Sequence, residues 1–226
     1  VEEKIDGSQF SFGIQDGEIQ VRSKGANLYI DAPEKMFTKA VETVKEIAPL
    51  LKEGWVYRAE YLQKPKHNAL VYDRVPNKHL ILFDVNPSHE EYLSYDEKRG
   101  EATKIGLEIV PLLYTGKVDS LELFRSFLDR ESVLGGQKIE GVVVKPLGYD
   151  LFGKDKKVIM GKFVSEAYKE VHSKAWGEAN PHSGDILQKI GGMYSSQARW
   201  MKAVQHLTEA GQTENSPKDI GRLIAE

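Results

Sequence analysis

A lysine in a short motif near the amino end of the chain could act as a nucleophile. The motif is Lys4-Ile5-Asp6-Gly7, in the run VEEKIDGSQFSF. We expect the lysine at the end of a short apolar strand, just before a tight Asp-Gly turn. There its amine could be held against a nucleotide. A second motif, EGVVVKP at residues 140–146, follows far downstream.

An amine attacks the α-phosphate of a nucleoside triphosphate only when it is neutral. The reference pKa of lysine is about 10.4, so an unperturbed lysine is neutral less than about 0.1% of the time near pH 7. Burial and nearby positive charge both lower the pKa of a lysine. Lys145 and Lys162 lie mid-strand in apolar runs, and we expect strand alternation to aim both side chains at one pocket.

A triphosphate also requires a divalent cation and positive groups to take up charge in the transition state. Acidic residues inside strands could hold such an ion through oxygen, and the candidates are Glu60, Asp84 and Glu140. Phe83 offers an aromatic face for a purine base. Plainer interpretations exist for each: Glu60 and Asp84 could be solvated edge carboxylates, Lys162 a surface lysine and Phe83 a core residue.

The composition excludes several other classes of function. The chain has 226 residues, of which 40% are hydrophobic and 29% charged, which is typical of a soluble globular protein. We find no apolar run near the roughly 18 residues of a membrane span and no signal-peptide pattern. The absence of cysteine excludes disulfides and thiolate metal sites and fits a cytosolic protein. No P-loop, GxGxxG or zinc-type histidine spacing is present.

The first third of the chain predicts a hairpin and a helix. Phe10 and Phe12 alternate with polar residues, and a turn at Gln15-Asp16-Gly17 leads into a second strand. Residues 34–53 then carry apolar side chains at helical spacing. Pro49 should kink the last turn of that helix.

The middle of the chain alternates strands with loops and one helix. WVYRAEYL and HLILFDVN are predicted strands joined by a basic loop. Asp119 and Glu122 have the spacing of a capping box that would begin a helix ending near Asp129. A Gly-Gly turn leads into EGVVVKP, and a lysine-rich turn leads into the strand VIMGKFV. This order predicts an α+β fold, with mixed or antiparallel sheets and flanking helices.

Two domains are predicted, with a boundary near residue 172. Residues 1–172 would form the α+β domain, and residues 173–226 read as a small helical segment that could be incomplete. The chain lacks an initiator methionine, so we expect Val1 to be a truncated or processed start.

Together the two motifs resemble those of the covalent nucleotidyltransferases, the superfamily of ligases and mRNA-capping enzymes. K-x-D-G alone is weak, but a second motif in the right order lowers the chance of coincidence to about one in several hundred. EKIDGSQF is similar to the nucleophile motif of ATP-dependent RNA ligases, particularly the phage RNA ligase 2 type. DNA ligases and capping enzymes usually carry an arginine where this chain has Ser8 or Gln9, and they add an OB-fold that residues 173–226 are too few to form.

The resemblance implies that ATP adenylylates Lys4 and that Mg²⁺ or Mn²⁺ is required. Asp84 and Glu140 would serve the metal ion and the nucleotide. Lys145 and Lys162 would contact the AMP phosphate. The region 1–172 would thus be an adenylyltransferase (nucleotidyltransferase) domain.

The resemblance also implies a pocket for the nucleoside. Glu3 would lie at the adenine edge, Phe83 would stack on the base, and Glu60 would contact the ribose. Asp6-Gly7 would belong to the same pocket. Arg22 is the best match to an arginine that the family carries after the first hairpin.

Two positions differ from the family pattern or leave its alignment open. A shift in alignment would replace Arg22 by Lys24 as the match. The last motif of the family commonly reads K-x-K, and its first lysine is replaced here by Met160. Lys154, Lys156 or Lys157 could compensate.

The predicted function is ATP-dependent joining of RNA 3′-hydroxyl and 5′-phosphate ends, for example at a nick in a duplex, by a cytoplasmic monomer without a membrane partner. The cytoplasm could be that of a host if the protein is phage-encoded. A DNA ligase, an mRNA guanylyltransferase and an inactive nucleotide- or RNA-binding module remain alternatives. The net charge of −3 means that nucleic-acid contacts would come from local basic clusters.

Overall fold

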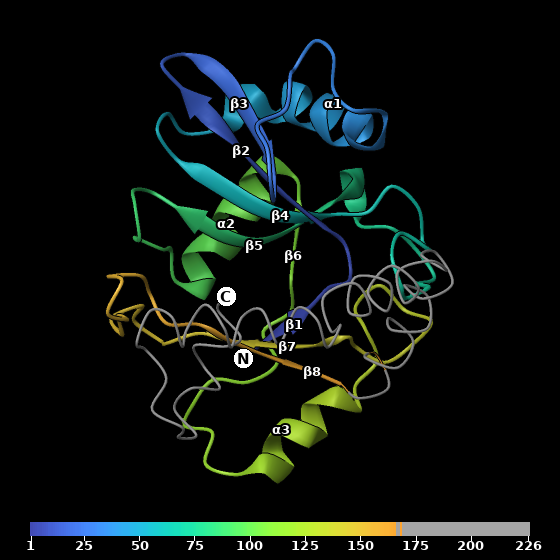
Figure 1. Cartoon of the computed structure of the whole chain (residues 1–226), viewed down its shortest axis with the longest axis vertical. Coiled ribbons are helices and arrows are strands. Elements are labelled where there is room, and N and C mark those ends of the chain that lie inside the picture. The colour runs from blue at the N-terminus through green and yellow to red at the C-terminus, as the bar shows by residue number, and fades with distance from the viewer. Residues whose placement is uncertain (166–167, 169–226) are drawn as a thin grey trace, which may run out of the picture. The chain divides into compact units, whose positions relative to one another are not determined.

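The computed structural model describes residues 1–165 and Tyr168. This part of the chain forms two β-sheets with flanking helices, so the predicted α+β class is confirmed (Figure 1). The predicted helical segment 173–226 and the boundary at residue 172 lie outside the described residues. Within the described part, the search for a helix long and apolar enough to traverse a lipid bilayer finds none.

The larger sheet has five strands in the order β3-β2-β4-β5-β6. Its strands are β2 (Ser8–Gln15), β3 (Glu18–Ser23), β4 (Val56–Tyr61), β5 (Leu80–Asn86) and β6 (Glu108–Ile109). Neighbouring strands are antiparallel except for β5 and β6. Asp16 and Gly17 link β2 to β3 with φ of 54° and 77°, values that match the right-handed strand twist and form the predicted hairpin.

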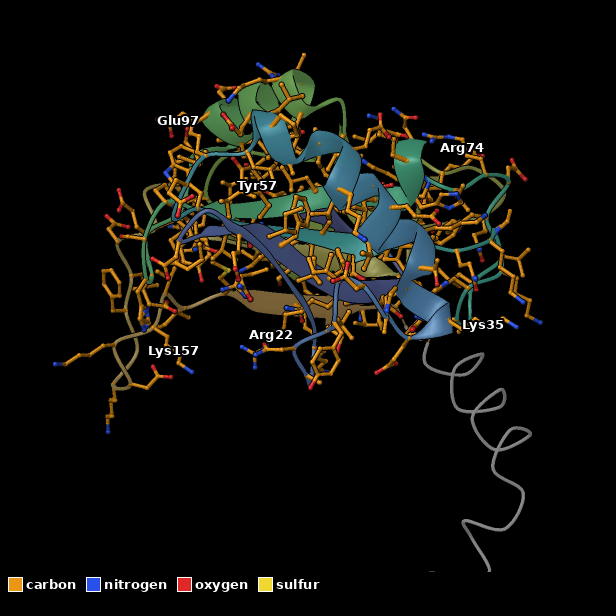
Figure 2. All side chains as sticks on the ribbon, turned by 90° about the horizontal axis from the view of Figure 1, so that it is seen from above. Arg22, Lys35, Tyr57, Arg74, Glu97 and Lys157 are labelled. Atoms are coloured by element: carbon orange, nitrogen blue, oxygen red, sulfur yellow. The ribbon has the colours of Figure 1, made fainter. Side chains whose placement is uncertain are left out.

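Helix α1 (Thr38–Ile47) packs on one face of this sheet. A 3-10 turn, Lys35–Phe37, precedes it and another, Ala48–Leu50, follows it. The predicted helix 34–53 is therefore shorter as an α-helix, because Pro49 cannot donate a backbone hydrogen bond to an α-helical turn. Figure 2 shows Tyr57 among the strands beneath this layer, where its ring is fully buried. Burial of each such aromatic side chain stabilises the fold by roughly 1.5–3 kcal/mol.

Helix α2 (Tyr95–Ile105) was not predicted from the sequence. Its start is a capping box, in which the Ser94 hydroxyl accepts from the Glu97 amide and the Glu97 carboxylate accepts from the Ser94 amide. Gly106 ends the helix with φ of 70°. Ala102 and Ile105 bury this helix against the core of the five-stranded sheet.

The smaller sheet has three strands in the order β1-β7-β8, namely β1 (Glu2–Lys4), β7 (Gly141–Val144) and β8 (Gly161–Val164). Helix α3 (Leu121–Leu128) packs against it through Phe127 and Val142. The side chain that caps α3 belongs to Ser120 rather than Asp119, because the Ser120 hydroxyl accepts from the Leu123 amide.

Both sequence motifs contribute strands to the smaller sheet, since Lys4 ends β1 and Gly141–Val144 form β7. Figure 1 shows the three-stranded sheet between α3 and the five-stranded sheet. Val142 packs toward α3, so the alternation of strand residues turns Val143 and its partners Glu2 and Lys162 the other way. Lys4, two residues from Glu2, shares that face. The candidate site therefore lies on the side directed at the larger sheet.

Candidate active site

Strand β1 brings the two sequence motifs into contact. Lys4 pairs with Gly141 in the β1–β7 ladder. The Lys4 Nζ lies 2.8 Å from both Oε1 and Oε2 of Glu140. The Lys4 side chain is 25% exposed and that of Glu140 only 4%, so the amine can be reached from solvent while its carboxylate partner is buried.

β1 is not the apolar strand that was predicted. Its buried positions include Glu2 and Glu3, which are 4% and 3% exposed. Buried carboxylates require partners, and both have them. The Glu3 carboxylate accepts from the Ser132 hydroxyl at 2.6 Å and from the Val133 amide at 3.1 Å. Its side chain is therefore engaged by the loop before β7, and its amide donates to the Pro111 carbonyl oxygen. The Glu3 carbonyl oxygen is the backbone group left to reach an adenine edge.

Glu140 contacts the Lys4 amine, and Glu60 and Asp6 lie close enough for their charges to act on this region. We call Lys4, Asp6, Glu60 and Glu140 the nucleophile cluster. Burial raises the pKa of Glu60 to about 8, an effect that the Lys4 ammonium opposes and that Glu140 and Asp6 reinforce. Burial likewise raises the pKa of Glu140 to about 7 against the opposing charge of Lys4. Glu60 Oε2 is buried without a hydrogen-bond partner among the described residues. The cluster thus has more acidic than basic groups, which favours a further cation.

The Asp6-Gly7 segment is held by the loop between β4 and β5. Asp6 Oδ2 accepts from the Ala69 and Leu70 amides at 2.8 and 2.7 Å, and the Asn68 side chain donates to the Gly7 carbonyl at 2.7 Å. A Cβ on Gly7 would lie 2.9 Å from the Tyr61 carbonyl oxygen, closer than real Cβ atoms approach. Glycine is therefore required where the chain crosses from β1 in one sheet to β2 in the other.

Ser8, where DNA ligases and capping enzymes carry arginine, contacts a histidine of the same loop. The Gln63 amide donates to His67 Nδ1 at 3.0 Å, so in the neutral ring Nε2 carries the hydrogen. Nε2 then donates to the Ser8 hydroxyl at 2.9 Å. Burial lowers the pKa of His67, in agreement with a neutral ring. The sequence offered no spacing signal for this pair.

A second group of charges lies beside the first, and we call Glu2, Asp84, Lys98 and Lys145 the paired-charge cluster. Lys145 Nζ lies 2.7 Å from Glu2 Oε2, 2.7 Å from Asp84 Oδ1 and 2.8 Å from the Phe83 carbonyl oxygen. Lys98 Nζ lies 2.6 Å from Glu2 Oε1 and 2.7 Å from the same carbonyl. All four side chains are at most 7% exposed.

The two lysines of this cluster respond differently to their shared surroundings. Burial, together with the charge of Lys145, lowers the pKa of Lys98 to about 8. Burial also opposes the charged form of Lys145, but Asp84 and Glu2 outweigh it and raise its pKa. Lys145 is therefore the more firmly charged of the two.

The structure separates some residues that were predicted to act together. Lys145 follows the last residue of β7 instead of lying inside the strand, since β7 ends at Val144. Asp84 contacts Lys145 whereas Glu140 contacts Lys4, so the two predicted metal ligands lie in different clusters. Lys162 is exposed on β8, and its positive charge partly opposes the rise in the pKa of Glu140 that burial causes.

Phe83 and Arg22 differ in their distance from the clusters. Phe83 is partly buried, and its ring centroid lies 6.0 Å from Lys145 Nζ. Arg22 is exposed on β3, and Figure 2 shows its side chain projecting away from the ribbon. The positive charge of Lys24 partly opposes the rise in the pKa of Glu60 that burial causes. Of the two candidates, only Lys24 acts on the charge of the nucleophile cluster.

The carboxylates fit a hydrated divalent cation better than a fully protein-bound one. Within residues 1–165 and 168, no three His, Cys, Asp or Glu side chains converge as ligands of one metal ion. Mg²⁺ usually keeps several waters and needs only one or two carboxylates besides substrate phosphates. The buried, unpartnered Oε2 of Glu60 and the Glu140 carboxylate, once released from Lys4, would supply those contacts.

Comparison with solved structures finds the same fold in an RNA ligase from Naegleria gruberi. One mutant of that ligase with ATP and Mn has a TM-score of 0.58 and 21% identity over 76% of this chain and 50% of that chain. A second mutant with ATP and Mn has a TM-score of 0.60 and 21% identity over 76% of this chain and 51% of that chain. The ligase with PPi has a TM-score of 0.57 and 20% identity over the same shares of the two chains. The chain thus spans about half the length of the solved chains it matches.

Comparison with curated protein sequences yields no match. A family model described as RNA ligase matches residues 1–164, which include both motifs and every residue of the two clusters. This match covers well over half of the 226 residues. The chain therefore belongs to the RNA ligase family.

Proposed function

We propose that the chain is an ATP-dependent RNA ligase of the phage RNA ligase 2 type. The observation that carries the proposal is the partly exposed Lys4 amine, held 2.8 Å from the buried carboxylate of Glu140. An accessible amine beside a buried carboxylate matches a nucleophile that works with a metal-bound nucleotide.

In the first step the Lys4 amine attacks the α-phosphorus of ATP. An N–P bond forms, the bond from that phosphorus to the bridging oxygen breaks, and pyrophosphate leaves. The amine must first lose a proton and release its ion pair with Glu140. The product is AMP joined to Lys4 as a phosphoramidate.

The surrounding residues divide the remaining tasks. Glu140 and Glu60 would hold Mg²⁺ or Mn²⁺. When bound, such a cation would balance the acidic cluster and withdraw charge from the α-phosphate. Lys145 and Lys162 would contact the AMP phosphate, and Phe83 would stack on adenine.

Asp84 was predicted as a metal ligand, and its carboxylate is paired with Lys145. It would reach a metal only if that pair opened. We therefore propose Asp84 as a partner of Lys145 in the resting site.

In the second and third steps RNA is the substrate. A 5′-phosphate oxygen attacks the AMP phosphorus, the N–P bond breaks and the Lys4 amine is restored. A 3′-hydroxyl then gives its proton to solvent and attacks the activated 5′-phosphorus. A phosphodiester forms, the phosphoanhydride bond to AMP breaks and AMP leaves. Exposed lysines between β7 and β8, among them Lys154, Lys156 and Lys157, could bind the phosphate backbone. We propose a monomer acting in the cytoplasm on a nicked RNA duplex.

The test is incubation with α-³²P-ATP and Mg²⁺ or Mn²⁺, followed by denaturing electrophoresis. Wild-type protein should carry a covalent label, and Lys4→Ala should carry none, because the variant lacks the amine that contacts Glu140. Lys35→Ala alters a lysine of the 3-10 turn before α1, marked in Figure 2, and this variant should take up the label like wild type. A folded, metal-supplied wild-type protein without label would favour the inactive binding module, for which Met160 is the sequence argument.

Two further assays separate the enzyme alternatives. Labelling by GTP in place of ATP would indicate a guanylyltransferase. Nicked duplexes that carry RNA or DNA at the 3′-hydroxyl side distinguish the two ligases. We expect joining only with RNA at that side, and equal joining of both would favour a DNA ligase.

A further inference from the structure

Lys98 is the most deeply buried lysine among the described residues, and the proposed chemistry does not use it. Its side chain is 0% exposed. It lies on α2, far from Lys4 in the sequence, yet its ammonium contacts Glu2 on β1 and the Phe83 carbonyl oxygen on β5. Burial of an ammonium group is unfavourable unless it is paired, so the position of Lys98 requires an explanation.

The paired-charge cluster is balanced only while both lysines remain in it. Two carboxylates, Glu2 and Asp84, face two ammonium groups. Glu2 is shared, with Oε1 on Lys98 at 2.6 Å and Oε2 on Lys145 at 2.7 Å. Asp84 Oδ1 is 2.7 Å from Lys145 and 3.8 Å from Lys98. Lys98 is thus already in place to take over both carboxylates.

The proposed function requires Lys145 to contact the AMP phosphate. In the present arrangement its ammonium is bound by Glu2, Asp84 and the Phe83 carbonyl oxygen. If the Lys145 ammonium moved to the phosphate, the buried carboxylates of Glu2 and Asp84 would lose one of their two counter-ions. A buried charge that loses its partner is strongly destabilising.

We propose that Lys98 is a positioning residue, the resident counter-ion that stays with Glu2 and Asp84 when Lys145 exchanges from these carboxylates to the nucleotide phosphate. This inference rests on the proposed function. Lys98 also anchors Glu2, which lies two residues before Lys4 on the same face of β1. The buried Lys98 ammonium would therefore allow Lys145 to leave its carboxylates, and it would also hold β1, the strand that carries Lys4.

The test is a double-mutant cycle with Lys98→Met and Glu2→Gln. For each variant the rate of lysyl-AMP formation is measured as a function of ATP concentration. Lys98→Met keeps the length of the side chain and removes its charge. It leaves Lys145 held by two carboxylates, so the maximal rate should fall about tenfold or more. Adding Glu2→Gln removes one carboxylate and leaves Asp84 paired with Lys145. The double variant should regain much of the lost rate.

A role in folding alone gives the opposite pattern. Removal of a second buried hydrogen-bonding group would then make the double variant no faster than Lys98→Met. If Lys98→Met does not fold, the double variant is compared with Glu2→Gln alone, and near-equal rates support the inference. Thermal unfolding of each variant identifies those that are folded.

Two results would overturn the inference. One is a folded Lys98→Met variant that is labelled at the wild-type rate with the same dependence on ATP. The other is a double variant that gains nothing over Lys98→Met. Both leave the proposed function intact, because wild-type protein is still labelled. If wild-type protein itself takes no label, the proposed function fails and the inference fails with it.

Discussion

The carboxyl groups of Glu140 and Asp6 are more deeply buried than the Lys4 amine. Glu140 contacts the Lys4 ammonium, and one buried oxygen of Glu60, Oε2, has no partner among the described residues. Such an arrangement is unfavourable for folding when every acid is ionised. It is suited to a ligand that brings positive charge, and sites of this kind commonly exchange stability for function.

Glu60 gives a pH-dependent prediction. Its folded pKa of about 8 exceeds the value of about 4.3 expected in an unfolded chain, so between these values unfolding releases a proton. The free energy of unfolding should therefore fall as pH rises through this window. Glu60→Gln cannot ionise, and without added metal it should gain at least about 1 kcal/mol relative to wild type between pH 5.5 and 8.5. Urea denaturation at the two pH values measures the difference.

The control for this prediction is Glu18→Gln, an exposed glutamate on β3. It should follow the pH dependence of wild type. Parallel curves for Glu60→Gln and wild type would contradict the assignment of a raised pKa to Glu60.

At the scale of elements, the close approach of β7 and β8 explains the glycine in the second motif. A Cβ on Gly141 would overlap the Phe163 carbonyl oxygen of β8. Gly141 also pairs with Lys4 and follows Glu140 directly. Any shift of β7 at this point would be transmitted to both members of the Lys4–Glu140 ion pair.

Gly141→Ala should therefore destabilise the protein by about 1–3 kcal/mol and also slow adenylylation of Lys4. Gly161→Ala is the matched control in the same sheet, because a Cβ there meets nothing within 4 Å. Its unfolding free energy should stay within about 0.5 kcal/mol of wild type. Chemical denaturation and the labelling assay test both variants, and equal behaviour of the two alanines would contradict the packing argument.

The sequence predicted those elements whose signals are local. The hairpin at Asp16-Gly17 and the strands around Glu60 and Asp84 follow from alternation and turn residues, and the structure agrees. Helix α2 was missed although its capping box, Ser94 to Glu97, could be read directly from the sequence. The hydrophobic periodicity of α2 is weak, because only a few of its apolar side chains reach the core, and so the sequence pattern did not indicate a helix.

The sequence could not predict which charges meet. Lys98 and Glu2 are 96 positions apart, and only the packing of α2 beside β1 brings them together. The cap of α3 moved by one residue, from Asp119 to Ser120, because either side chain suits an N-cap and tertiary packing selects the register. Motifs identified the nucleophile, whereas the partners of Asp84 and Lys145 depend on the fold.

At the scale of the whole described domain, the candidate site draws on both sheets. Lys4 and Glu140 belong to the three-stranded sheet and Glu60 to the five-stranded sheet. The chain crosses between them within Ile5–Gly7. A nucleotide bound at Lys4 and Glu60 would connect the two sheets, and it would lose this site on unfolding.

Binding of ATP with a divalent metal should therefore raise the unfolding temperature. At a ligand concentration of about 100 times Kd the stabilisation is about 2.7 kcal/mol. Lys4→Ala should show a similar rise, because the non-covalent contacts remain. Thermal unfolding with and without ATP and Mn²⁺ measures it, with ATP omitted as the control for metal alone. An unchanged unfolding temperature for wild type would contradict a nucleotide site between the sheets.

The backbone of β1 is fastened along both edges. β7 pairs with it on one side, and on the other the Glu3 amide donates to the Pro111 carbonyl oxygen while Glu2 bridges to Leu112. The backbone that carries Lys4 is thus fixed in place. An adenylyl group on Lys4 could move only by rotation of the lysine side chain. The RNA terminus would have to travel to the lysine, so mutations that misplace the incoming strand should halt the reaction with the enzyme still loaded.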